Sequence, residues 1–256
     1  MSKRTRFVIT SLILSLGFIG IQFLNDQNRF WAIGVLGLLT AGLFFWSLFE
    51  NLGKNMTLMT LILPVMFTLG VGFFWFLLPA NIFARIPVVI FYALGIYVLC
   101  LTANIYSVAA VRTIALLRAA RGVGFVLTLL TSFLVFDAVL SVRTEVYYVV
   151  PLVFILSFPL YLQGLWSMVL DSDNTKKLIF FSTIFSLLTA ELSAAIYFWP
   201  VTIVVGSLFL TASFYMLLGL GQAKLEGRLF SSTIREHLVV GILIFAAMFI
   251  STHWGG

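Results

Sequence analysis

The sequence predicts an all-α protein, a polytopic bundle of about nine transmembrane helices. Of its 256 residues, 62% are hydrophobic and only 9% are charged, whereas soluble domains carry about 25% charged residues. The apolar residues also gather into long runs, most of which have the roughly 17–25 residues that a membrane-spanning helix needs. We therefore expect residues 1–256 to form one helical domain within a lipid bilayer.

The first apolar run, residues 7–24, follows a basic segment that contains Lys3, Arg4 and Arg6. A signal peptide has a similar start, but this run is about long enough to span a bilayer and no small-residue cleavage site follows it. We interpret it as a retained helix whose N-terminus is cytoplasmic. The further runs lie at residues 31–49, 56–78, 88–111, 122–140, 148–170, 178–198, 201–221 and 237–252, and the last is slightly short.

Prolines interrupt this pattern at three places. Trp199 and Pro200 separate two runs that would otherwise form one over-long helix. Proline suits the first turn of a helix, where its missing N–H would have no partner, so we expect a new helix to begin here. Pro64 and Pro159 lie inside runs, where each frees a backbone carbonyl and predicts a kink.

The basic residues predict the orientation of the bundle. With the N-terminus inside, twelve of the fifteen lysines and arginines fall on the cytoplasmic side, and only Arg29, Arg85 and Arg143 fall outside. Cytoplasmic loops carry such an excess of basic residues. We expect the C-terminus outside and a location in a bacterial-type inner (cytoplasmic) membrane.

Arg112, Arg118 and Arg121 form the densest basic segment, on the predicted cytoplasmic side. Basic residues next to a membrane span contact anionic lipid headgroups, which is the functional interpretation of this segment. Topology alone also explains these arginines, and we favour that explanation. Because the basic residues lie in short groups between apolar runs, a nucleic-acid partner is not expected.

Two acidic residues lie within apolar runs, and Glu191 is the first candidate. An acid at the centre of a membrane helix costs about 2.5–3.5 kcal/mol, so such residues usually face a cavity or a partner. Thr189, Ala190 and Ser193 are small neighbours in the sequence, and small residues favour close helix contacts. We expect Glu191 to face another helix, either as a structural hydrogen-bonding group or as a titratable group in a cavity.

Asp137 is the second candidate. It lies three residues from the predicted helix end at Leu140, and Arg143 is close enough in sequence to pair with it. We favour an interfacial acid paired with a loop arginine. The alternative is a joint acidic site with Glu191, which requires the two helices to be neighbours.

Motifs for catalysis are not found in the sequence. His237 and His253 stand at opposite ends of the last run, Cys100 is the single cysteine, and no zinc-protease, phosphate-loop or serine-nucleophile motif occurs. No metal or cofactor is predicted. We expect a non-catalytic membrane component that binds lipid or a partner membrane protein. The alternatives are a transporter of lipid or a small solute that uses Glu191 with Asp137, and an enzyme acting on a lipid-linked substrate.

Overall fold

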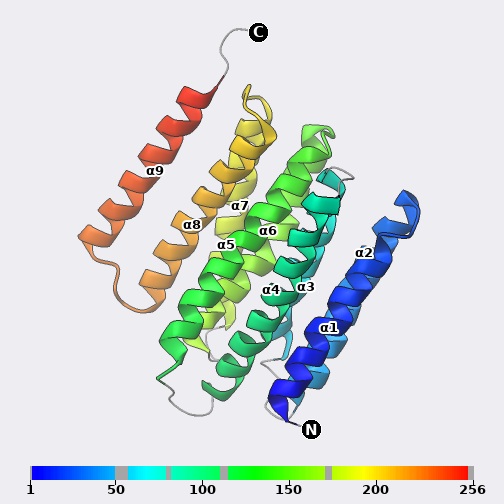
Figure 1. Ribbon diagram of the computed structural model, residues 1–256. Coiled ribbons are helices and arrows are strands. Elements are labelled where there is room, and N and C mark those ends of the chain that lie inside the picture. The colour runs from blue at the N-terminus through cyan, green and yellow to red at the C-terminus, as the bar shows by residue number, and fades with distance from the viewer. Residues whose placement is uncertain (1, 50–56, 79–81, 110–114, 171–174, 253–256) are drawn as a thin grey trace. The chain divides into compact units, whose positions relative to one another are not determined.

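The computed structural model describes residues 2–49, 57–78, 82–109, 115–170 and 175–252, and within these ranges all regular secondary structure is helical (Figure 1). The helices are α1 (Lys3–Ile21), α2 (Asp26–Leu48), α3 (Thr57–Leu77), α4 (Ile82–Ala109), α5 (Leu117–Ser141), α6 (Val146–Val169), α7 (Thr175–Tyr197), α8 (Ile203–Leu225) and α9 (Ser231–Ser251).

The predicted class, a polytopic helical membrane protein, is confirmed. Eight of the helices in the described residues are long and apolar enough to cross a bilayer, and α3 contributes a shorter apolar segment, Met59–Trp75. The last run looked short because polar residues precede it, but α9 continues through them and begins at Ser231. Pro64 and Pro159 lie inside α3 and α6, as expected.

The chain divides into two compact units, Met1–Thr131 and Ser132–Gly256, and α5 runs from the first into the second. Each unit is described by itself below. The expectation of a single domain stays a prediction.

A chain of buried hydroxyl groups links three helices of the first unit. Thr40 of α2 lies 3.0 Å from Thr68 of α3, and Thr68 lies 3.1 Å from the hydroxyl of Tyr92 in α4. The rings of Phe18 and Phe67 cover Tyr92, which is fully buried. Lipid is as apolar as leucine, so helices in a bilayer associate through packing and interhelical hydrogen bonds of this kind.

The second unit is built around the contact between α6 and α7. Tyr161 of α6 hydrogen-bonds Thr189 of α7 at 2.8 Å, and its ring stacks on Phe214 of α8 with centroids 4.0 Å apart. The buried face of α7 consists mostly of small polar residues. These are Ser182, Ser186, Thr189, Ala190 and Ser193. Small side chains let neighbouring helices approach closely, which explains why this face of α7 packs inward.

Helix α9 is attached to α8 and to the connection before it. His237, near the start of α9, stacks on Tyr215 of α8 with ring centroids 5.6 Å apart. At the other end of α9, Trp199 donates a hydrogen bond from Nε1 to Thr252 at 2.8 Å. Most of the remaining surface of α9 is exposed, as expected of a helix at the edge of a bundle.

Candidate functional site

The end of α5 has an unusual backbone conformation. The helix ends at Ser141, and Arg143 has a φ of 49°, in the left-handed region. Helices often end with a left-handed residue, but that residue is usually glycine. Arginine pays a strain on the order of 1 kcal/mol there, and residues held in such conformations cluster at functional sites. Arg143 is therefore a residue whose side chain needs an explanation.

The connection between α7 and α8 lies opposite Arg143. Helix α7 ends at Tyr197 and α8 begins at Ile203, so the predicted break at Trp199 and Pro200 is confirmed. Pro200, however, is not in the first turn of α8. Thr202 precedes that turn, and its side chain accepts a hydrogen bond from a backbone N–H in it at 3.4 Å. A threonine satisfies a free N–H at a helix start, which proline cannot do.

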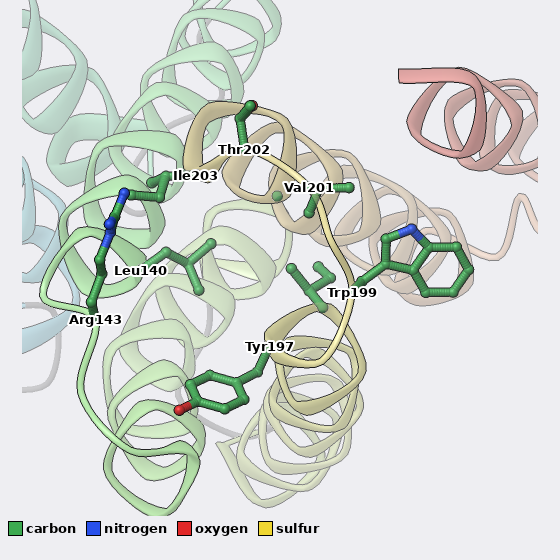
Figure 2. Close-up of a pocket in the computed structure, with 9 residues that line it drawn as sticks. Leu140, Arg143, Tyr197, Trp199, Val201, Thr202 and Ile203 are labelled. Atoms are coloured by element: carbon green, nitrogen blue, oxygen red, sulfur yellow. The ribbon is translucent and has the colours of Figure 1, made fainter. Parts of the chain in front are cut away.

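A pocket of about 200 Å³ lies between these two segments (Figure 2). It is lined by Leu140, Arg143, Ile196, Tyr197, Trp199, Val201, Thr202, Ile203 and Gly206, all within the second unit. The floor and walls are mainly aliphatic. Arg143, Tyr197 and Thr202 are the exposed polar side chains among the lining residues, and Figure 2 shows the Trp199 indole turned away from Arg143. The pocket is thus apolar inside and polar at its mouth.

Gly206 keeps the floor of the pocket open. A Cβ atom added at Gly206 would lie 3.0 Å from Cγ2 of Ile196 and 3.3 Å from Cδ1 of Leu140. Both distances are shorter than ordinary van der Waals contacts, so α8 approaches its neighbours here only because this position has no side chain. Any larger residue would displace the lining residues or fill the floor.

A buried pair of polar residues lies about one helical turn beneath the pocket. Asp137 is only 5% exposed, and its Oδ1 accepts a hydrogen bond of 3.1 Å from the fully buried hydroxyl of Ser207. Asp137 stands three residues before Leu140, and Ser207 directly follows Gly206. The expected pairing of Asp137 with Arg143 is corrected. Because α5 stays helical to Ser141, Asp137 remains inside the bundle, beside α8.

The mouth of the pocket is positively charged. The other two arginines predicted outside make contacts in the first unit. Arg29 donates to the carbonyl of Gln22 at 2.8 Å, and Arg85 lies 5.2 Å from the ring centre of Trp75. The guanidinium of Arg143 has no hydrogen-bond or carboxylate partner among the described residues. The N-terminus of α8, where the helix dipole places partial positive charge, adds to this field.

Glu191 lies elsewhere, on the exposed face of α7. The expected contact with another helix is corrected, and helix geometry gives the reason. Successive residues on a helix point about 100° apart. Thr189, Ala190 and Ser193 therefore occupy the buried face while Glu191 points away from it. No contact in the described residues joins Glu191 to Asp137, so the structure does not bring the two acids together.

The basic segment lies apart from the pocket. Arg118 is exposed and Arg121 is half-buried, both near the start of α5. Arg112 lies outside the described residues, so contact of this segment with lipid headgroups stays a prediction. The described residues also contain no group of three or more histidine, cysteine, aspartate or glutamate side chains that could hold a metal.

Sequence reasoning missed three residues that shape this site, namely Ser207, Gly206 and Thr202. Each has a side chain, or lack of one, that matters only through its neighbours. One signal was available. Arg143 is among the few basic residues on the predicted outer side, and the charge rule that explains the cytoplasmic arginines gives no reason for it.

Comparison with known proteins places the chain in a family. No curated protein and no solved structure matches it. The family described as "Protein of unknown function (DUF5656)" matches residues 9–251, which is nearly the whole length. This match fits a protein that is helical throughout and membrane-embedded, and the chain belongs to the DUF5656 family.

Proposed function

We propose that this protein is a non-catalytic membrane component that binds the anionic headgroup of a lipid in the pocket between α5, α7 and α8. One observation carries the proposal. Arg143, held in a strained conformation and without an anionic partner among the described residues, stands at the mouth of an otherwise aliphatic pocket.

The lining residues suit both parts of a lipid. The planar guanidinium of arginine can donate two parallel hydrogen bonds to a phosphate group. The hydroxyls of Tyr197 and Thr202 and the start of α8 add donors at the same opening. Leu140 and Ile203 offer apolar surface to the glycerol and the first part of an acyl chain. A free phosphate ion would gain nothing from that apolar surface.

The position of the pocket also supports a headgroup ligand. The pocket lies where α5 and α7 end and α8 begins, which is the level of the headgroups for a helix that spans a bilayer. Tyr147, Tyr148 and Phe198 are exposed aromatic residues next to the same helix ends. Aromatic side chains are enriched at this depth, where an apolar ring meets the polar interface.

A second candidate function is proton-linked transport, and the buried position of Asp137 favours it. Acids inside a membrane protein often carry protons along a transport path. Asp137 and Ser207 lie directly below a pocket that opens at the helix ends. In this alternative Asp137→Asn abolishes transport while folding persists, whereas lipid binding alone tolerates the substitution.

The test measures lipid binding by native mass spectrometry of the purified protein, with phosphatidylglycerol against phosphatidylcholine of equal chain length. Wild type should retain phosphatidylglycerol preferentially. Arg143→Gln should weaken that preference by about tenfold, since a charge-assisted hydrogen bond contributes about 1.5–3 kcal/mol. Gly206→Leu, which fills the floor, should weaken the binding of both lipids.

Arg85→Gln is the matched control, because it removes one positive charge from the same predicted side but lies in the first unit. It should leave the lipid preference unchanged. Inorganic phosphate and glycerol 3-phosphate, added in separate titrations, should compete poorly. Equal retention of the two lipids, or an equal loss from both arginine variants, would exclude a specific headgroup site at Arg143.

A further inference from the structure

Glu191 belongs to a continuous exposed stripe on α7. The stripe consists of Ile184, Leu187, Leu188, Glu191, Ala195 and Phe198, all of which are exposed. Residues three and four apart are neighbours on a helix, so these side chains form one face along the half of α7 nearest to the pocket. The buried small residues of α7 occupy the opposite face. No helix among the described residues of the second unit covers the stripe.

An exposed carboxyl group on this face conflicts with a lipid surrounding. Acids within membrane helices are costly when they face acyl chains, and they almost always find a hydrogen-bonding partner. Glu191 stands six residues before the end of α7, which is about 9 Å along the helix axis. The other five residues of the stripe are apolar and offer it no partner. Its partner must therefore come from outside the stripe.

We infer that the stripe is a docking surface for a second copy of this chain, with α7 packed against α7 and the two Glu191 side chains hydrogen-bonded to each other. In a two-fold symmetric contact a residue near the axis meets its own copy. A neutral carboxyl group both donates and accepts a hydrogen bond, so two of them satisfy each other. Ala195, one turn beyond Glu191, leaves room for the two helices to approach.

Charge favours this occupant over a basic partner helix. A lysine or arginine opposite Glu191 would place two opposite charges in hydrocarbon, where the loss of hydration can exceed the attraction between them. Two neutral carboxyl groups avoid that loss. The apolar residues around Glu191 carry no charge that a basic helix would recognise. The stripe is thus complementary to itself.

The test is disulfide cross-linking in native membranes with single added cysteines. Leu188→Cys places a thiol in the stripe, and Ile242→Cys places one on an exposed part of α9. Both positions lie nine residues before the end of their helices, so the two thiols are matched in depth. Wild type, whose one cysteine is buried, is the blank. Leu188→Cys should give a dimer of twice the chain mass, and Ile242→Cys should behave like the blank.

Two further variants test the role of the acid itself in the Leu188→Cys background. Glu191→Gln keeps a group that donates and accepts hydrogen bonds, so the dimer should persist. Glu191→Leu should weaken dimerisation about tenfold, which corresponds to about 1.4 kcal/mol. Because Glu191 is exposed, the thermal stability of the monomer in detergent should stay the same in both variants.

Several results would overturn the inference. These are equal cross-linking of Leu188→Cys and Ile242→Cys, an unchanged dimer in the Glu191→Leu variant, and a cross-linked product with the mass of a different protein. Reaction of a Leu188→Cys thiol with a second cysteine introduced into α2 of the same chain would show that the first unit covers the stripe instead.

Discussion

Ser207 joins α8 to α5 by donating a hydrogen bond to Asp137, with 3.1 Å between Oγ and Oδ1. The hydroxyl also lies 3.0 Å from the carbonyl of Val204, so its one hydrogen is shared between two acceptors. Helix α5 contributes one polar residue to this contact and α8 the other. The pair therefore fixes the height of α8 beside α5, and with it the floor of the pocket.

Removing this contact should destabilise the second unit. Ser207→Ala leaves Asp137 buried without its donor, and interhelical hydrogen bonds in membranes average about 0.6 kcal/mol with a maximum near 1.7 kcal/mol. We expect a loss of that size in the free energy of unfolding, measured by thermal or denaturant unfolding in detergent. Asp137→Asn keeps an acceptor and should change stability by less than about 0.5 kcal/mol.

Ser213→Ala is the matched control for Ser207→Ala. Ser213 is a buried serine of the same helix, and its hydroxyl donates to the carbonyl of Phe209, four residues earlier on α8. It makes no hydrogen bond to another helix among the described residues, so its removal should cost less. Equal losses from the two serine variants would show that Asp137 contributes nothing to the stability of α8.

The conformation of Arg143 gives a second prediction. Glycine adopts a φ near 49° without strain, so Arg143→Gly should leave the free energy of unfolding unchanged or raise it by about 1 kcal/mol. Arg143→Val also lacks the guanidinium, but a β-branched residue is disfavoured at positive φ and should destabilise. Thermal unfolding in detergent separates the two variants.

Both variants should lose the preference for phosphatidylglycerol, although only one of them is destabilised. That combination separates the role of the guanidinium from the role of the backbone. If Arg143→Gly is as unstable as Arg143→Val, the left-handed conformation is not the source of strain at this position.

The orientation of the helices is a third prediction, and it rests on the distribution of basic residues. Single cysteines at Arg118 and in the segment 222–236 should react with a membrane-impermeant maleimide only after the cells are opened. Cysteines at Tyr147 and Gly256 should react in intact cells. Buried Cys100 gives a low background. A C-terminus that labels only from the inside would mean that one of the nine expected spans does not cross the membrane.

The fold class and the approximate positions of the helices follow from the sequence alone. A bilayer requires about twenty apolar residues per span and satisfies backbone groups only within helices, so long apolar runs indicate both class and number. The ends of helices were less certain. Helix α9 continues into a polar segment because charged and hydroxyl residues are compatible with a helix that emerges from lipid. The break at Trp199 and Pro200 was visible because proline interrupts a helix wherever it lies.

The tertiary structure decided which side of each helix meets another helix. In a soluble protein, polar residues mark the outside of a helix. In a bilayer, a side chain that faces lipid is as apolar as one that is packed inside, so the hydrophobic pattern does not report the buried face. Glu191 and its small neighbours therefore looked alike in the sequence, and only the rotation of α7 placed them on opposite faces. The contact of Asp137 with Ser207 joins positions 70 residues apart in the chain, and packing alone brings them together.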